Sequence, residues 1–459
     1  MKKWETIILG AVLALLVALF GFWAFTEKAQ PLANYCSGIL SLVLFALCVA
    51  RAVPGLKPFF TSSEPPAPDA ELGERSLRGS RRHPWLNIII WVILTRIAVY
   101  IAAYCVYTIA NGYSGGLFNA MERMWVRTDA PHYIGIAQNW YQTQGDARLH
   151  LVFFPLYPII ISFFNLFIGN TFASAMVVSN LFSIGAAIAA YELAAIDMDR
   201  AGALRMTRYL FLLPGAFFFA APMSESLFVF LCLLCIYLIR KKRYLWGCLA
   251  GGLAAFTRSP GVLLAVPVFM EYVRELVQTR RAGDKPLFLR RLWGRGACLF
   301  LIPLGLIGYL FVNYTVSGNP FQFMIYQWEN WHQRFGLFFN TAAYQMDYAF
   351  KAAAGGNWGQ LFGLWLPNLI AVFGSLGIML KGAKKLRPSY TAYFLVYFVM
   401  TIGATWLLSA PRYLAAAFPL AFVIADLTKK KAVDWVVSAL LVVCYVVFMG
   451  MFVLGYPIY

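Results

Sequence analysis

The sequence predicts an all-α polytopic membrane protein, and three observations lead to that fold class. Of the 459 residues, 61% are hydrophobic and only 13% are charged, which is unlike a soluble globular domain. Apolar segments of membrane-spanning length recur along the whole chain. Basic residues concentrate in the short connectors between them, as the positive-inside bias predicts for cytoplasmic loops. The formal charge of +18 therefore indicates topology and contact with membrane lipids, not nucleic acid binding.

The first two expected helices form an out-and-back pair near residues 6–25 and 33–53. Two lysines precede about 20 apolar residues at the start, and no small-residue cleavage site follows, so we expect a transmembrane helix and no cleaved signal. The segment 54–84 is rich in Pro, Glu and Arg, a composition typical of a mobile cytoplasmic linker. We assign residues 1–84 to this helix pair and linker.

The remaining topology follows from holding the basic connectors on the cytoplasmic side. These connectors are Lys2 with Lys3, 75–82, 200–208, 240–243, 274–295, 381–387 and 429–431. Further spans are expected near 85–111, 171–192, twice within 208–240, then at 244–257, 261–273, 297–315, 361–380, 388–408, 411–427 and 433–455. The total is about 13 transmembrane helices, with the amino terminus inside and the carboxyl terminus outside. Two large outer loops result, 112–150 and 316–360, and the first carries juxtamembrane helices.

The apolar segment 151–169 disturbs this alternation. If it and 171–192 both crossed the membrane, the arginines of 200–208 would lie outside, and the basic residues 240–243 could lie inside only if 208–240 crossed once. That region has 33 residues and is interrupted by the polar "PMSES", so it favours two short spans. We therefore expect 151–169 to lie in, or re-enter, the outer leaflet, because Pro155 and Pro158 weaken a regular helix there. The alternative is an ordinary span.

With this topology, the unusual polar residues near the spans reach the outer face. They are Arg127, Asp129, His132, Ser224, Glu225, Ser226, Thr257, Arg258, Ser259, Trp328, Glu329, Trp331, His332, Arg334 and Arg412. Ionisable groups at hydrocarbon ends are costly unless they are paired or used. The set therefore predicts a functional site on one face of the membrane.

Each of these residues also has a structural explanation. Asp129 precedes Ala130 and Pro131 and is placed to N-cap a helix. Glu225 is able to pair with an arginine and so close a turn. Arg258 or Arg412 is able to extend its charged end to the membrane–water interface, as long basic side chains do. His132 alone is typical of a hydrogen-bonded structural histidine. Trp328 and Trp331 also fit an interfacial aromatic belt, and loop surface accounts for Asp146, Arg148 and His150.

The mixture of two carboxylates and several cations on one side indicates glycosyl transfer from a lipid phosphate. A carboxylate removes the proton of the acceptor hydroxyl as it attacks the anomeric carbon. Arginines bind the phosphate and stabilise the charge that it gains on leaving. No nucleotide-binding fold is visible, so a nucleotide-sugar donor is disfavoured. The polyprenyl tail of a lipid donor would need a groove between helices.

The cysteines give no sign of a disulfide framework or a metal site. All eight lie in or beside apolar spans, and no cluster has metal-ligand spacing. Cys232 and Cys235 form a C-x-x-C within an apolar helix, which favours packing over redox chemistry. No cofactor and no metal are expected.

The polar motifs also resemble, in order, the successive blocks of the PIG-V-like mannosyltransferases. The blocks are "RTDAPHYIGIA", "FFPLYP", "PMSESLF", "AAFTRSPG", "GNPFQF", "QWENWHQRF" and "PRYLAAAFPL". That family includes the second mannosyltransferase of GPI-anchor assembly and its bacterial relatives, and it belongs to the GT-C superfamily. The resemblance covers roughly residues 85–425 and implies a GT-C fold, with a catalytic transmembrane module at 85–315 and an outer loop with carboxyl-terminal helices at 316–459. The spans before residue 85 have no counterpart in it.

The resemblance implies roles for individual residues. The family's first outer loop carries a catalytic aspartate within R-W-D-A-x-H-Y, and Asp129 matches it. Thr128 stands where the family usually has a tryptophan. The substrate-binding residues that we expect are Arg127, His132, Tyr133, Ser224, Glu225, Arg258, Ser259, Trp328, His332, Arg334 and Arg412.

The function predicted is therefore an integral membrane glycosyltransferase, most simply a mannosyltransferase. Its donor would be a polyprenyl-phosphate sugar and its acceptor a lipid or glycan on the extracytoplasmic face, with inversion at the anomeric carbon. If the protein is bacterial, it would lie in the plasma membrane. Two further functions stay open: a transporter or flippase of a lipid-linked sugar, and a GT-C enzyme with another sugar. No internal repeat is visible, which disfavours a transporter.

Overall fold

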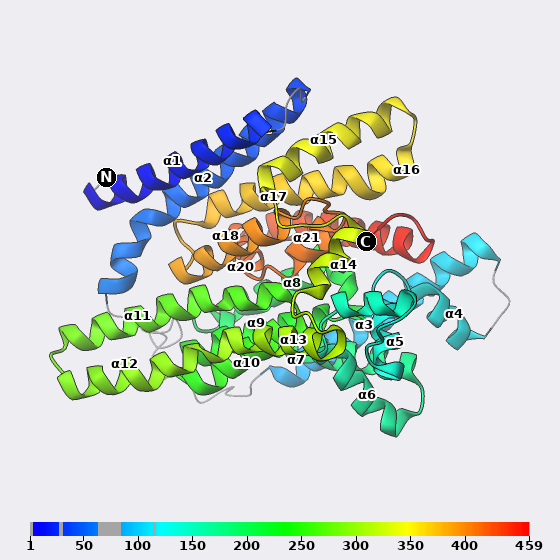
Figure 1. Cartoon of the computed structure of the whole chain (residues 1–459), viewed down its shortest axis with the longest axis horizontal. Helices are drawn as coiled ribbons and strands as arrows, with labels where there is room; N and C mark the ends of the chain where they lie inside the picture. The colour runs from blue at the N-terminus through cyan, green and yellow to red at the C-terminus, as the bar shows by residue number, and fades with distance from the viewer. Residues whose placement is uncertain (1–2, 27–30, 63–83, 113–115, 459) are drawn as a thin grey trace.

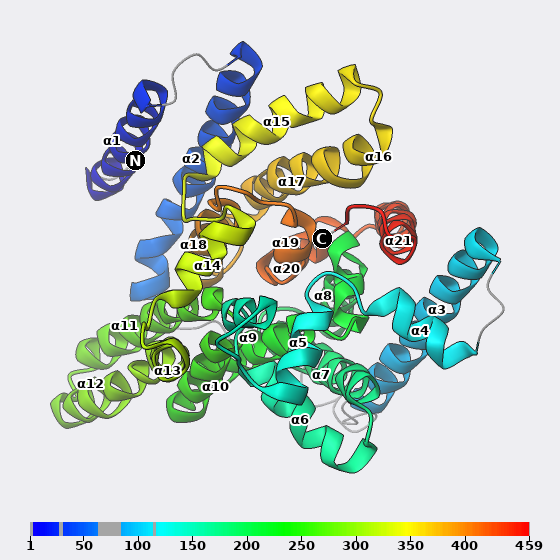
Figure 2. The same ribbon diagram turned by 45° about the vertical axis from the view of Figure 1, so that its right-hand side comes forward.

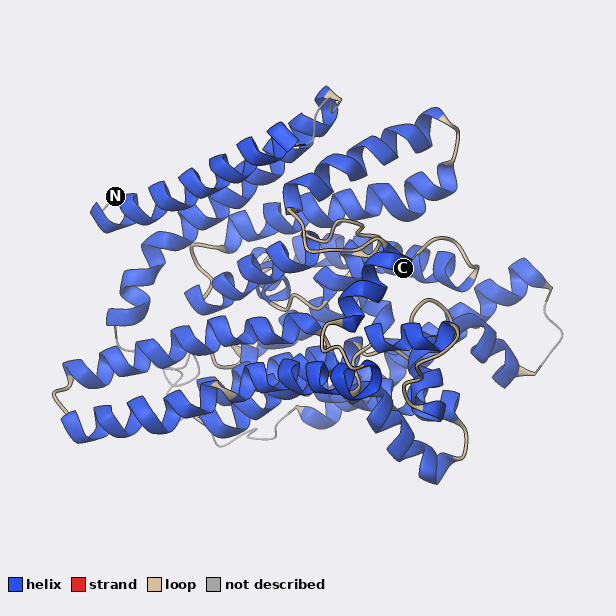
Figure 3. Cartoon of the chain, viewed as in Figure 1, coloured by secondary structure: helices blue, strands red, loops and turns tan. Residues whose placement is uncertain are grey.

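The computed structural model describes residues 3–26, 31–62, 84–112 and 116–458. Within those residues the chain is almost entirely helical and has no named strand; Phe335 and Ala404 form an isolated bridge (Figure 3). The all-α fold class predicted from the sequence is confirmed.

The helices follow the apolar pattern of the sequence closely. In chain order they are α1 (Lys3–Thr26), α2 (Leu32–Thr61), α3 (Trp85–Asn111), α4 (Leu117–Trp125), α5 (Ala130–Asn139), η2 (Asp146–Val152), α6 (Leu156–Ile168), α7 (Thr171–Ala194), α8 (Arg200–Leu212), η3 (Pro214–Ala220), α9 (Glu225–Arg240), α10 (Tyr244–Thr257), η4 (Ser259–Leu264), α11 (Ala265–Arg281), α12 (Lys285–Leu299), α13 (Leu301–Ser317), α14 (Gln322–Trp331), α15 (Phe338–Ala354), α16 (Trp358–Gln360), η5 (Leu361–Trp365), α17 (Leu366–Gly382), α18 (Pro388–Ile402), α19 (Ala410–Ala415), α20 (Pro419–Leu427) and α21 (Lys431–Val453). Elements η2, η3 and η4 are 3₁₀ helices, and η5 is a π-helical turn.

Seven of the described helical stretches are long and apolar enough to cross a membrane, and the number rises to nine if two bent helix pairs each count as one span. They make the chain an integral, multi-pass membrane protein. The expected total of about 13 spans is not confirmed. Helix α10 has the expected bounds and α18 is shorter than expected, and with 14 and 15 residues both lie below the roughly 20 that a straight crossing needs.

The helices run mostly along the long axis of the molecule (Figure 1). The amino terminus, the carboxyl-terminal end of α2 and the α11–α12 turn lie toward one end, and α4, α5 and α6 lie toward the other. Basic side chains of the α11–α12 hairpin, among them Arg280, Arg281 and Lys285, mark the first end. This polarity agrees with the positive-inside assignment.

Two segments expected as connectors are partly helical. Residues 54–61 continue α2, with Pro54 and Pro58 inside the helix, so the linker predicted for 54–84 is wrong over that stretch; residues 63–83 lie outside the described part of the chain. Residues 274–295 form most of the α11–α12 hairpin. Arg274 is buried there and donates its Nε–H to the carbonyl oxygen of Phe59 at 2.7 Å. This bond between the Arg274 guanidinium and the carboxyl-terminal end of α2 explains why the basic segment 274–295 packs as helices instead of forming a loop.

The core lies around α9, which packs between α7 and α10 and contacts η3 and η4. Close packing at α10 depends on small residues. A Cβ added at Gly305 of α13 would lie 1.8 Å from the carbonyl oxygen of Gly252, so the two backbones touch only because both residues are glycine. Figure 2 shows α1 at the periphery of the molecule, beside α2.

The segment 151–169 folds as the end of η2 and the short helix α6, which meet at a bend of 112°. Helix α6 has 13 residues and a length of about 20 Å, less than the roughly 30 Å hydrocarbon thickness. Its length fits a segment that enters one leaflet and does not cross it.

We expect a cysteine at position 170, between α6 and α7, to face the outside. Asn170→Cys in a cysteine-free background should react with an impermeant thiol reagent added to intact cells, whereas Ala282→Cys in the α11–α12 turn should react only after permeabilisation. Labelling of position 170 that requires permeabilisation would show that 151–169 crosses the membrane.

Candidate functional site

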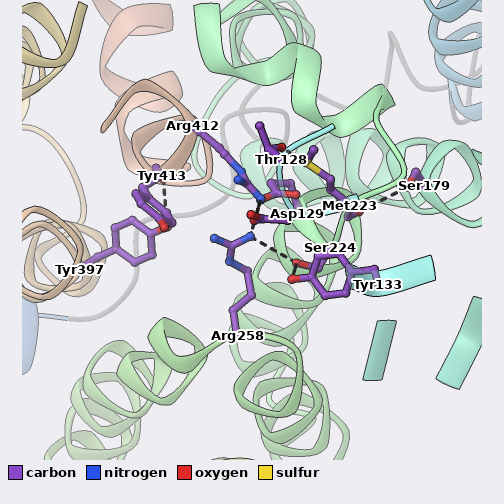
Figure 4. A network of polar contacts seen from close by, with 11 residues as sticks. Thr128, Asp129, Tyr133, Ser179, Met223, Ser224, Arg258, Tyr397, Arg412 and Tyr413 are labelled. Atoms are coloured by element: carbon purple, nitrogen blue, oxygen red, sulfur yellow. Dashed lines mark hydrogen bonds and ion pairs between the residues drawn. The ribbon is translucent and has the colours of Figure 1, made fainter. Parts of the chain in front are cut away.

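Four charged side chains from distant parts of the chain meet in one cluster (Figure 4). Arg412 binds Asp129 through its terminal nitrogen at 2.5 Å and Glu225 through Nε at 2.6 Å. Arg258 pairs with the same oxygen of Glu225. We call Asp129, Glu225, Arg258 and Arg412 the charged cluster. Its two carboxylates and two guanidinium groups balance in charge, as a low-dielectric surrounding requires.

Each member of the cluster sits at or near the end of a helix. Asp129 directly precedes α5, Glu225 begins α9, Arg258 directly follows α10, and Arg412 lies in the short α19. Helix α19 approaches η3 closely because Gly215 has no side chain: a Cβ there would lie 2.2 Å from the carbonyl oxygen of Pro411. The adjacent Arg412 is thereby held against the start of α9.

Asp129 occupies the N-cap position of α5 but does not act as a cap. Its backbone is already helical, and its side chain makes no capping hydrogen bond. The carboxylate points to Arg412 instead. The preceding Thr128 adopts a left-handed conformation, with φ of 53°, which is costly for a β-branched residue and is characteristic of functional sites. The helix-cap explanation of Asp129 is therefore not supported.

Exposure distinguishes the two carboxylates. The side chain of Glu225 is 3% exposed and is shared between two arginines, whereas that of Asp129 is 30% exposed. Burial raises the pKa of Asp129, but the Arg412 guanidinium outweighs it, with Arg258 and His132 adding to that effect, so the pKa lies below its ordinary value. Asp129 is thus the ionised carboxylate that a ligand can reach.

A neutral hydrogen-bond chain extends the cluster. Tyr133 and Ser224 share a hydrogen bond of 2.8 Å between their hydroxyl oxygens, and Arg258 donates to the Ser224 oxygen at 3.3 Å. The guanidinium of Arg258 also lies over the ring of Tyr413, 5.3 Å from its centre. Both contacts fix the direction of the Arg258 side chain.

An aromatic group adjoins Asp129. His132 stacks on Phe153 with ring centres 4.5 Å apart, and the rings of His150 and Trp331 meet it edge-on at 5.3 and 6.3 Å. Burial lowers the pKa of His132 despite the opposing charge of Asp129, so the imidazole is neutral near pH 7. We call His132, His150, Phe153 and Trp331 the aromatic group.

Several predicted site residues lie apart from the cluster's contacts. Arg127 has a buried Nε with no hydrogen-bond partner among the described residues, and its guanidinium packs on Gly455 near the carboxyl terminus. Ser259 begins η4. The Trp328 ring meets His332 edge-on, and the Arg334 guanidinium lies 3.6 Å from the centre of the Trp328 ring.

Two residues beside Asp129, His150 and Phe153, were not among the site residues predicted from the sequence, whereas Trp331 belonged to the predicted polar set. Trp331, not Trp328, reaches His132, and His150 packs against that ring although the sequence suggested loop surface. Phe153 belongs to the "FFPLYP" segment, so its motif was a usable signal. For His150 the sequence offers none, because its contact depends on how η2 folds back over α5.

Two pockets in the described part of the chain lie away from the charged cluster. The larger of two pockets, of about 570 Å³, is lined by the ends of α2, α7, α17 and α20, and the other, of about 330 Å³, by Asn119, Glu122, Arg123 and Val126. Neither is lined by the charged cluster. Among the described residues no group of three or more His, Cys, Asp or Glu side chains is arranged to hold a metal ion.

Comparisons with known proteins show a likeness in structure and none in sequence family. No family model and no curated protein matches this sequence. The structure of ArnT from Cupriavidus metallidurans, bound to undecaprenyl phosphate, aligns with a TM-score of 0.46 and 15% sequence identity, over 76% of this chain and 62% of ArnT. The chain thus spans less than two thirds of the length of ArnT. Function is therefore inferred from the charged cluster itself.

Removing Glu225 should destabilise the protein strongly. Glu225→Ala leaves two buried arginines facing each other without an anion between them, and loss of one partner from a buried pair costs about 3–5 kcal/mol. Thermal unfolding of the purified protein in detergent measures this. Lys351→Ala, which breaks an exposed pair with Asp347, is the matched control and should leave the midpoint unchanged. Equal midpoints for both variants would contradict the central role of Glu225.

Proposed function

We propose that this protein is an integral membrane glycosyltransferase of the GT-C type. It transfers a hexose, mannose in the specific form of the proposal, from a polyprenyl-phosphate sugar to a lipid or glycan acceptor on the extracytoplasmic face, with inversion. The observation that carries the proposal is the charged cluster, in which a partly exposed carboxylate touches a guanidinium group at the end of an apolar helix bundle. The motif blocks of the sequence supply the same residues.

In this reaction Asp129 is the general base. Its carboxylate takes the proton of the acceptor hydroxyl, and the hydroxyl oxygen forms a bond to the anomeric carbon. The bond from that carbon to the donor phosphate oxygen breaks, and its electron pair leaves with the phosphate. Arg258 and Arg412 bind the phosphate and stabilise this charge.

Glu225 acts as a positioning residue. It is almost fully buried, and one of its oxygens holds both guanidinium groups. Its other oxygen has no hydrogen-bond partner among the described residues. A carboxylate fixed between two guanidinium groups sets the separation and direction of the groups that meet the phosphate.

Arg412 links donor binding to the state of the base. It bonds Asp129 and Glu225 at once, so a donor phosphate would compete with Asp129 for the same guanidinium. Loss of that contact raises the pKa of Asp129 toward the range that suits a general base. The aromatic group beside Asp129 offers ring faces on which a sugar can stack.

Asp129→Asn separates the base from a structural residue. Asn has nearly the same shape as Asp but cannot accept the proton, so turnover should fall roughly 10²- to 10⁴-fold. Turnover is measured with polyprenyl-phosphate mannose and a competent acceptor. Separate assays use the polyprenyl-phosphate forms of glucose, galactose and aminoarabinose as donors. The thermal midpoint checks that the fold is intact.

Donor binding distinguishes the arginines from the base. Binding of polyprenyl-phosphate mannose should survive in Asp129→Asn and weaken in Arg258→Ala, since each charge-assisted hydrogen bond contributes about 1.5–3 kcal/mol. Full turnover in Asp129→Asn would remove Asp129 from catalysis. Movement of the intact donor across the bilayer, with no transfer to any acceptor, would favour a flippase.

The pH dependence tests the contact between Arg412 and Asp129. Because Arg412 lowers the pKa of Asp129, wild-type kcat/KM should show no acid limb down to about pH 5. In Arg412→Gln that pKa rises, so residual kcat/KM should fall at a higher pH. A variant profile that keeps the wild-type shape, at lower amplitude, would mean that Asp129 is not the group whose ionisation limits the rate.

A further inference from the structure

The larger pocket lies at the far end of the bundle from the charged cluster. About 570 Å³ in volume, it is formed by the α7–α8 and α17–α18 turns together with the ends of α2 and α20. Helix α9 connects the two regions. Glu225 is its first residue, and Arg240, its last, binds Asp197 in the pocket wall at 2.7 and 2.8 Å. A helix of 16 residues places them roughly 23 Å apart.

Positive charge predominates in the lining of this pocket. Five cationic side chains line it, against three carboxylates. The cations are Arg205, Lys384, Lys385, Arg387 and Lys429, and the carboxylates are Asp197, Asp199 and Asp426. The excess of cations makes an anion the favoured ligand.

Most of these charges already have partners. Asp197 is neutralised by Arg240, and Arg387 binds Glu271 at 2.6 and 2.7 Å. Asp426 is shared by Lys385 and Lys429. Asp199 accepts a hydrogen bond from the backbone N–H of Gly202 and caps α8.

Arg205 and Lys384 are left with donors to offer. Arg205 donates its Nε–H to the carbonyl oxygen of Ala425 at 3.0 Å, which anchors the guanidinium at the pocket wall. Its two terminal nitrogens make no hydrogen bond to the described residues, and the exposed ammonium of Lys384 makes none either. An anchored guanidinium and a mobile ammonium form a donor set suited to a tetrahedral oxyanion.

We propose that this pocket binds a phosphate group, held by Arg205 and Lys384. The phosphate is carried by the head of an anionic phospholipid or by a soluble phosphate compound. Basic pockets between membrane helices on the cytoplasmic side hold lipid head groups, and the basic connectors assign this end of the bundle to that side. The apolar floor, which includes Phe59, Phe422 and Val423, suits the glycerol and upper acyl carbons of a lipid. The site is independent of the proposed glycosyl transfer.

The test measures binding of short-chain phosphatidic acid to the full-length protein in detergent, with short-chain phosphatidylcholine as the reference. Wild type should bind phosphatidic acid preferentially. Lys384→Gln removes an exposed side chain that makes no hydrogen bond or ion pair with the described residues, and should weaken binding roughly tenfold with the thermal midpoint unchanged. Arg205→Gln should weaken it further.

Lys381→Gln is the matched control. Lys381 lies three residues earlier, in the last turn of α17, is exposed, and does not line the pocket, so its loss removes the same charge without removing a ligand donor. This variant should bind phosphatidic acid as wild type does. Equal weakening in Lys381→Gln and Lys384→Gln would overturn the proposal, since the effect would then be one of net charge. No preference for phosphatidic acid in wild type, together with no binding of soluble phosphates, would overturn it too.

Competition identifies the source of the phosphate. If phosphatidic acid binds and glycerol 3-phosphate or inorganic phosphate fails to displace it, the site holds a lipid head group. If those soluble compounds bind with similar affinity and share the dependence on Lys384, it holds a soluble phosphate compound. Both outcomes support the proposal.

Discussion

The salt bridge that Arg412 makes with Glu225 organises the functional end of this protein. Both side chains are 3% exposed, and each would be very costly to bury alone. The pair therefore requires the start of α9 and the short α19 to meet, although 187 residues separate them. Arg258 and Asp129 complete the balance of charge. Once these four groups are paired, the ends of α10 and α5 are fixed as well.

The same constraint explains why the cluster suits catalysis. The four groups neutralise one another, so they can be buried without a bound ion. A phosphate that enters can replace one of the carboxylates as the partner of a guanidinium group. Asp129, the most exposed of the four, is the group that such an exchange would release. The left-handed backbone conformation of Thr128 sets the direction of the chain just before Asp129. The same ion pairs therefore stabilise the fold and hold the groups proposed to react.

Helix α9 carries charge at both ends and apolar side chains between them. Glu225 joins the cluster, and Arg240 joins Asp197 and Tyr390, to whose hydroxyl it donates at 2.6 Å. A buried helix with paired ionic ends is held in register along its axis, because sliding it would break both sets of contacts. This gives the two ends of the bundle fixed positions relative to each other.

The sequence by itself determined the helical, membrane-spanning class and placed several helices, among them α3, α7 and α10, within a few residues, because apolar length and basic connectors are local properties. It also selected Asp129, Glu225, Arg258 and Arg412, since charges beside hydrocarbon segments are conspicuous. Only the tertiary structure decided that Asp129 binds Arg412 instead of capping α5, that Trp331 and His150 join the site, and that α2 continues through two prolines. These outcomes depend on contacts between segments that are distant in the sequence, and a local sequence pattern cannot predict the energies of such contacts.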